Sequence, residues 1–429
     1  MMMMMMIHSS SFLAVLLTAF ILTNTLASDA DLFVHSKEAQ VMGPSTFPKP
    51  TDKLPDGAVP IVQPIHGHHR PDQDAILAYA EGYEIQWYLS FIESLKATGF
   101  QGDLVLAIAE ERIRSKGVME YLSAQPFVVV YSITMDCFES DKVTPAPRRV
   151  MDKTGNLDIF QMCLLNDVYG WNNDQGQVVK TAKDPRIGRV VATLRYEWYW
   201  IWAQHYNPNA WMMVMDARDS FFQLNPFQNL PRSNNPTKGK IWFFGENTNA
   251  TRLGLSTKNI NWLKNGYGDV LLNQLKQKPT ICSGSTMGER VAIEEYLKAE
   301  ISEDDETPVR MTGSDQGFHN YLYYSHKLSN VHAIESLTVW EQGKGLINNL
   351  GALRIKSLEE WGIYNKETHE VLQWDGSLSP VVHQWDRDSQ LFNYRFKDLM
   401  GAMKSWWKME YQRMQENGLT ESGNYFSKA

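Results

Sequence analysis

Short continuous hydrophobic runs and helically spaced apolar residues follow one another along the first part of the chain. Continuous runs at 74–80, 103–109 and 127–131 predict strands that are buried on both faces. Apolar residues recur three and four positions apart over 85–98, which predicts a helix, and residues 118–123 are compatible with a shorter one. This alternation of strands and helices predicts a parallel sheet with helices on its faces.

The pattern continues towards a central strand, which a run of apolar residues predicts at 211–215. The preceding segment, 190–206, predicts a helix whose aromatic residues are assigned to core packing rather than to ligand stacking. The expected buried stripe of this helix is Leu194, Trp198, Ile201, Trp202 and His205.

Similar patterns predict further elements in the C-terminal half. The predicted strands are 238–246, 279–288 and 379–387, with short strands and turns over 331–351. The predicted helices are 289–298, 313–324 with Ser314 as its N-cap, and 392–414. The polar, turn-rich segment 139–190 is expected to lie mostly at the surface, and the acidic run 303–306 is expected to be a solvated loop.

The N-terminal region has a different pattern. The apolar run at 12–22 is short for a membrane span and predicts a signal peptide cleaved after Ala27, with an uncleaved signal anchor as the alternative. Either reading directs the chain to the secretory pathway, as a Golgi-lumenal or a secreted protein. Prolines are frequent over 28–73, which predicts an extended stem or linker. At its end, His66, His68 and His69 are assigned to a solvated loop rather than to a metal site.

The remaining chain is long enough for one large domain. We assign 74–390 to this domain and 391–429 to a C-terminal helix that packs on it, followed by a tail. A hydrophobic fraction of 43% and 14 tryptophans support a substantial core, and a net charge of -8 gives no indication of nucleic-acid binding. Three cysteines predict one bridge and one free thiol without specifying the pair, and Asn249 begins a glycosylation sequon.

Charged residues directly follow the predicted central strand. Asp216, Arg218 and Asp219 come just after its apolar run. Buried carboxylates are costly unless they are paired or bound to metal, and ligand sites in open α/β sheets lie at the carboxyl ends of the strands. A solvated turn in which Arg218 neutralises an acid is the alternative. Only one glycine follows the strand at 74–80, so the chain lacks the glycine-rich loops of dinucleotide-binding and P-loop proteins.

Four short blocks occur in order along the chain and carry a resemblance. They are Asp216–Phe227, which fits the pattern Asp-x-Arg-Asp-x-x-Phe-Gln-x-x-Pro-Phe, Cys282–Gly284, Asp315–Gln316 and Val382–Arg387. Over residues 74–388 the sequence resembles the GT-A class of nucleotide-sugar glycosyltransferases, and in particular eukaryotic members that carry the first block. The resemblance implies an α/β fold: a GT-A, Rossmann-like mixed sheet, mostly parallel and flanked by helices.

The resemblance also implies a metal site. In this class an acidic motif holds a divalent cation, usually Mn²⁺, that bridges the diphosphate of the sugar nucleotide. It assigns Asp216 and Asp219 to the metal and the nucleotide, and His383 as the third protein ligand. The class motif is Asp-x-Asp, whereas these acids are three positions apart. Both reach one metal if the chain turns at Ala217; otherwise one of them binds the ribose, or the metal through water.

Further nucleotide-binding roles follow from the resemblance. Tyr79 is expected to stack on uracil, Arg195 to bind the diphosphate, and Arg218 either to contact phosphate or to pair with an acid. Ser283 and Gly284 are expected to line the pocket for the donor sugar.

The catalytic residues implied are Asp315 and Gln316, at a helix N-terminus. Asp315 would be the general base of an inverting enzyme, and in a retaining enzyme either residue would stabilise the oxocarbenium-like centre; the Asp-Gln pair favours retention. A carboxylate that stabilises the start of the helix is the alternative for Asp315.

The resulting hypothesis is a metal-dependent glycosyltransferase that moves a sugar from a nucleotide-sugar, expected to be a UDP-sugar, to a glycan or glycoprotein acceptor. The first alternative is a secreted, non-catalytic carbohydrate-binding protein on the same fold. The second is a glycoside hydrolase, which needs two carboxylates across the sugar but leaves His383 without a role.

Overall fold

A computed structural model describes residues 46–114, 117–133, 135–139, 144–145, 162–309 and 311–416. All of these residues belong to one compact unit, Gly43–Ala429. The predicted signal peptide, 1–27, and the first part of the predicted stem lie outside the described residues. Within the described ranges, no helix combines the length and the apolar character needed to cross a membrane.

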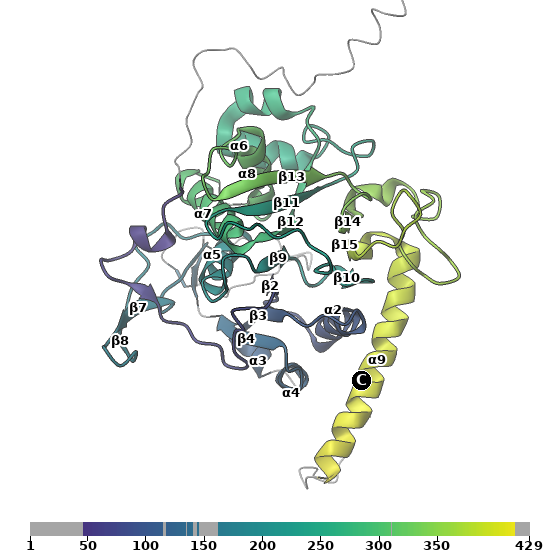
Figure 1. Ribbon diagram of the computed structural model, residues 1–429, viewed down its shortest axis with the longest axis horizontal. Coiled ribbons are helices and arrows are strands. Elements are labelled where there is room, and N and C mark those ends of the chain that lie inside the picture. Colours follow the sequence, from purple (N-terminus) through teal and green to yellow (C-terminus); the bar gives the residue numbers. More distant parts are fainter. Residues whose placement is uncertain are drawn as a thin grey trace, which may run out of the picture. The chain divides into compact units, whose positions relative to one another are not determined.

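The centre of the fold is a mixed sheet, to which the described residues contribute seven strands in the order β13-β11-β12-β9-β2-β3-β4 (Figure 1). The strands are β2 (Ala75–Tyr79), β3 (Asp103–Ala109), β4 (Val128–Ile133), β9 (Trp211–Met215), β11 (Gly239–Gly245), β12 (Ile281–Glu289) and β13 (Ile334–Trp340). β12 runs antiparallel to both of its neighbours, and the other neighbouring pairs are parallel. The predicted mostly parallel, mixed α/β sheet is therefore confirmed.

Helices cover both faces of the sheet because its strands are apolar on both sides. Leu77 packs into a cluster with α5 (Val191–Ala203), α7 (Arg290–Glu306) and α8 (Ser314–Tyr324). Its neighbour Ile76 packs into a second cluster with helices α2 and α4. These two helices are α2 (Ile85–Ala97) and α4 (Val118–Ser123). Successive strand residues point to opposite faces, so a continuous apolar run supplies two cores at once.

A small second sheet brings the C-terminal part of the chain to the main one. Its order is β10-β15-β14, and the strands are β10 (Ser220–Phe222), β14 (Ile347–Asn349) and β15 (Val381–His383). β10 follows β9 after a short turn, so this sheet is anchored where the central strand ends. The last helix, α9 (Ser389–Glu416), packs against α2, which agrees with the expected C-terminal helix (Figure 1).

The predicted stem is shorter than the proline spacing suggested. Phe47 and Ala58 are buried, and β1 (Val59–Pro60) pairs with β7 (Tyr169–Asn172). Proline is compatible with a short edge strand, since it lacks only the N–H that would bond on one side. Residues 46–73 therefore belong to the folded unit.

The three histidines at the end of this segment were expected in a solvated loop, and His69 contradicts that. Its ring nitrogens lie 2.9 Å from the Tyr206 hydroxyl and 2.8 Å from the Tyr131 hydroxyl. Its ring stacks on that of His205, which is exposed because α5 ends at Ala203. The predicted buried position of His205 was thus wrong.

One surface prediction was wrong and a second holds only in part, because several charged residues are buried and paired. The acidic run 303–306 lies inside α7, where the buried Glu303 is paired with Lys327 and accepts a hydrogen bond from Tyr267. Within 139–190, the described part contains buried Asp184 and Arg189. These two residues belong to a group of charged side chains that pair with one another: Asp184, Arg186, Arg189 and Glu197.

Two further predictions concerned the N-cap of α8 and the disulfide bridge. The predicted N-cap of α8 was wrong by one position: Gly313, with φ 81°, occupies the N-cap, and Ser314 is the first helical residue. Cys137 and Cys163 form a disulfide and Cys282 is free and buried. One bridge and one free thiol agree with the expectation.

Candidate metal centre and active site

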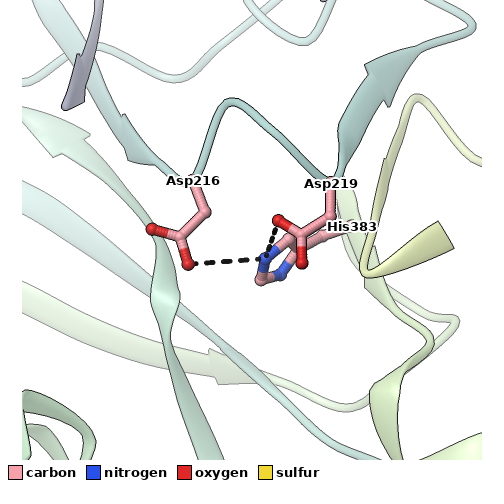
Figure 2. Close-up of side chains that lie close together, drawn as sticks. All are labelled: Asp216, Asp219 and His383. Carbon is pink, nitrogen blue, oxygen red and sulfur yellow. Dashed lines mark ion pairs between the residues drawn. The ribbon is translucent and has the colours of Figure 1, made fainter. Parts of the chain in front are cut away.

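The acidic block forms a turn that directs both carboxylates to one side. β9 ends at Met215 and β10 begins at Ser220. The Ser220 hydroxyl donates to the Asp216 carbonyl oxygen at 2.6 Å, and the Asp216 N–H donates to the Gly284 carbonyl at 3.1 Å. Asp216 and Asp219 consequently face each other across the turn (Figure 2). The chain turns at Ala217, so two acids three positions apart lie at one site, as expected for this case.

His383 reaches the same place through strand pairing. β15 pairs with β10 in an antiparallel register that sets His383 opposite Ser220, next to Asp219. Its Nε2 lies 3.9 Å from Asp216 Oδ2 and 3.7 Å from Asp219 Oδ1 (Figure 2). One ligand atom from each of the three residues falls within 4.8 Å of the others, so Asp216, Asp219 and His383 could hold a metal ion.

Asn349, at the end of β14, determines which nitrogen of His383 faces the acids. Its amide nitrogen donates to the Phe244 carbonyl at 3.0 Å, so its Oδ1 is the atom 2.8 Å from His383 Nδ1. An amide oxygen only accepts hydrogen bonds, so Nδ1 carries a hydrogen, and in the neutral form of the ring, the form that binds metals, Nε2 is bare.

The surroundings of His383 Nε2 indicate whether these three residues fit a metal ion. Nε2 is buried and has no hydrogen-bond partner among the described residues. Its distances to the two carboxylates exceed the ~2.7–3.2 Å of a hydrogen bond. A lone pair that faces two carboxylates is electrostatically unfavourable on its own, whereas a cation between them satisfies all three groups. Carboxylate oxygens with one imidazole suit a divalent ion such as Mn²⁺.

Gly284 makes room for this arrangement. A Cβ at this position would lie 2.6 Å from Asp216 Oδ2 and 2.8 Å from His383 Cε1. Any side chain would therefore displace the candidate ligands. The small residues at the start of β12 let its backbone approach the ligands closely.

The two carboxylates differ electrostatically. Desolvation opposes ionisation of Asp216, but the charge of the Arg195 guanidinium and its hydrogen bond to this carboxyl outweigh desolvation and lower the pKa of Asp216. Burial, reinforced by the charge of Asp216, raises the pKa of Asp219 despite the opposing charge of Arg218. The pair thus carries competing negative charge in a small volume, a condition that a bound cation relieves.

Arg195 connects the acidic turn to α8. Its guanidinium pairs with Asp216 and donates to Asp315 Oδ2 at 2.8 Å. The same Asp315 oxygen accepts a hydrogen bond from Ser283 Oγ at 2.9 Å. Asp315 lies in the first turn of α8, as the helix-stabilising alternative required, but its charge is also tied to the candidate site.

The structure brings most of the predicted site residues together, and two of them, Tyr79 and Gln316, differ from expectation. Tyr79 is 7% exposed and packs in the core, so its ring is not open to a nucleotide base. The Gln316 side chain is held by Asn259, to whose Oδ1 it donates at 2.9 Å. Arg218 lies 3.0 Å from Asp386, which fits the acid-pairing interpretation.

Asn349 escaped the sequence analysis. It stands in a stretch without a recognisable motif, and its role depends on contacts with β11 and β15, which are remote in sequence. A histidine predicted as a metal ligand does imply some hydrogen-bonding partner, but the sequence offers no means of choosing it.

The sequence matches no protein-family model and no curated protein. The functional argument therefore depends on the geometry described above.

Proposed function

We propose that this protein is a metal-dependent glycosyltransferase of the GT-A class that uses a nucleotide-sugar donor. The observation that supports it most is the bare Nε2 of His383 between Asp216 and Asp219, at the edge of an α/β sheet where ligands bind. Such a site suits a ligand that brings both a cation and a diphosphate.

Asp216, Asp219 and His383 are the residues that would hold the cation, for which we propose Mn²⁺. When bound, the cation supplies positive charge that stabilises a diphosphate leaving group. Asn349 keeps His383 in the tautomer that this role requires. Gly284 leaves space for the ligands, and Ser283 lines the adjacent surface.

Arg195 and Asp315 form the other half of the proposed site. The Arg195 guanidinium is a suitable donor group for phosphate oxygens, and it holds the Asp315 carboxylate towards the acidic turn. In the retaining reaction that the Asp-Gln pair favours, the Asp315 carboxylate stabilises positive charge at the anomeric carbon. In an inverting reaction it accepts the proton of the acceptor hydroxyl.

The proposed setting is the secretory pathway, in the Golgi lumen or outside the cell. One disulfide and the exposed sequon residue Asn249 support an oxidising compartment. The proposed acceptor is a glycan or glycoprotein, and the proposed donor is a UDP-sugar.

A thermal-shift titration tests this proposal. The purified chain is melted with UDP, GDP or CMP, each with and without Mn²⁺. A nucleotide at 100 times its dissociation constant stabilises the folded state by about 2.7 kcal/mol. We expect stabilisation by one nucleotide, only with Mn²⁺, and its loss in Asp219→Ala and His383→Ala.

Two surface variants serve as matched controls. Asp269 has a side chain that is 64% exposed, and His332 is exposed, so Asp269→Ala and His332→Ala remove the same chemical groups away from the site. Both should retain the stabilisation. If no nucleotide stabilises the unaltered protein with Mn²⁺, the transferase proposal fails and a carbohydrate-binding protein becomes the better account.

A further inference from the structure

A second feature of the same sheet edge is a pocket with a volume of about 310 Å³. It opens beyond the ends of β11 and β13, and the residues used below are Glu246, Asn249, Glu341, Lys344, Trp361 and Trp374. The strands β9, β11 and β13 point in the same direction, so this pocket and the acidic turn lie at the same edge. The volume is at the lower end of the ~300–1,000 Å³ found for small-molecule sites.

Two tryptophans form one corner of the pocket. Their ring centroids are 6.2 Å apart and their planes meet at 75°. The indole N–H of Trp374 donates to the Gln342 carbonyl at 2.7 Å, and that of Trp361 donates to the Leu353 carbonyl at 2.9 Å. Because backbone carbonyls already engage both N–H groups, the rings offer the pocket their apolar surfaces. Trp374 is 39% exposed, an unusual amount of aromatic surface to leave in water.

The opposite side of the pocket is polar. Glu246 and Glu341 contribute carboxylates, and Asn249 contributes an exposed amide. Lys344 pairs with Glu341. These groups both donate and accept hydrogen bonds, and Lys344, the one cation among the described residues that line the pocket, is paired with Glu341, so these residues offer no unpaired cation to an anionic ligand.

The combination of aromatic faces and hydrogen-bonding groups suits a saccharide without charge. The C–H bonds of a pyranose carry partial positive charge, and they are attracted to the electron-rich face of an indole ring. Its hydroxyl groups are both donors and acceptors, which matches carboxylates and amides. A pocket of this volume is on the scale of a monosaccharide unit rather than of a folded partner.

Direct contacts connect the pocket to the metal centre. The Glu246 carboxylate is hydrogen-bonded to Gln316, the residue after Asp315. The Phe244 carbonyl, two residues before Glu246, accepts the hydrogen bond from Asn349 that orients His383. The pocket is therefore linked to the metal centre through Gln316 and through the end of β11.

We propose that this pocket binds an uncharged saccharide, which is the terminal sugar of the acceptor glycan. Its role as an acceptor site depends on the proposed transferase function, whereas saccharide binding by itself does not. The proposal assigns Trp374 and Trp361 as stacking surfaces and Glu246 and Glu341 as partners for hydroxyl groups.

The test is binding of the purified chain to an array of neutral oligosaccharides, each printed beside the same glycan with a terminal sialic acid. Thr251→Ala is introduced throughout to abolish the sequon, so that no glycan attached at Asn249 competes for the pocket. We expect binding to neutral glycans, weaker binding to their sialylated forms, and a loss of roughly tenfold or more in affinity for Trp374→Ala.

Trp171→Ala is the matched control, because Trp171 is also partly exposed and also donates its N–H to a backbone carbonyl, that of Asp56, at 3.1 Å. It should bind glycans like the unaltered chain. The pocket assignment is overturned if no neutral glycan binds, if the sialylated forms bind equally well, or if Trp374→Ala has no effect. UDP with Mn²⁺ is titrated separately into the unaltered chain. Failure of that titration alone would remove the transferase and leave a saccharide-binding pocket.

Discussion

Replacement of Gly284 by alanine gives the sharpest test of the metal centre. The new Cβ would lie 2.6 Å from Asp216 Oδ2, whereas ordinary contacts begin at 3.4 Å, so the carboxylate oxygen must move by about 0.8 Å. The new Cβ would also lie 2.8 Å from His383 Cε1, so the imidazole ring must move by about 0.6 Å. Metal–ligand distances tolerate only about 0.2 Å.

We therefore expect Gly284→Ala to lower Mn²⁺ affinity by about 10–100-fold, since misplacing the support of a ligand has effects of this size. This corresponds to about 1.4–2.7 kcal/mol of binding free energy. The assay is isothermal titration of Mn²⁺ at a saturating concentration of the nucleotide that stabilises the unaltered protein. The metal-free melting temperature is recorded first, to show that the variant is folded.

Gly245→Ala is the matched control. It lies in a neighbouring strand at the same edge, and its Cβ would make ordinary contacts, at 3.4 Å with the Trp340 carbonyl and 3.6 Å with the Thr280 carbonyl. Its Mn²⁺ affinity should remain within about twofold, or ~0.4 kcal/mol, of the unaltered protein. Equal Mn²⁺ affinity in Gly284→Ala and the unaltered protein would refute the assignment of Asp216 and His383 as ligands of one ion.

Three further predictions follow from other residues. Asn349→Leu removes the acceptor that holds His383 in its tautomer, so Mn²⁺ titration should show a loss of about 10–100-fold in affinity in a variant that still melts cooperatively. Burial raises the pKa of Glu246 from 4.5 to about 7, so the stability that its protonated form contributes is complete below about pH 4.5 and is lost as the pH rises through 7. In urea unfolding, Glu246→Gln should gain about 1–3 kcal/mol of unfolding free energy relative to the unaltered protein over this interval. Parallel pH profiles of the two proteins would contradict the burial of Glu246. Reduction of Cys137–Cys163, which are separated by 26 positions, should lower the unfolding free energy by about 3 kcal/mol, and an unchanged urea midpoint would show that the bridge does not constrain the unfolded chain.

The strands and helices of the sheet were predictable because their signal is local. The run at 103–109 coincides with β3, and the segment 118–123 coincides with α4. In both cases the apolar pattern alone determines the element, because the burial of neighbouring residues follows the periodicity of the backbone. The acidic turn was equally accessible, since it follows the central strand directly.

The errors share a physical cause, which is pairing between segments remote in sequence. Glu303 was assigned to solvent from its acidic neighbours, but its partner Lys327 comes from the residues after α8. Phe47 was assigned to a stem, but it is buried and its N–H donates to Glu295 at 3.2 Å. The local sequence indicates that burial of a charge or of a proline-rich segment is unfavourable. It does not identify the residue, remote in sequence, whose interaction compensates for that burial.

The free cysteine behind the metal centre makes the protein its own reporter of local opening. Cys282 Sγ lies 3.7 Å from His383 Nδ1, and the side chain is buried in the unit that also carries the disulfide between the two other cysteines. A thiol reagent reaches the buried Cys282 only when the surrounding structure opens, so the rate of alkylation under native conditions measures how often this part of the molecule opens. A ligand that bridges the acidic turn and His383 would slow the modification, which gives a chemical readout of occupancy that needs neither a known donor nor a known acceptor.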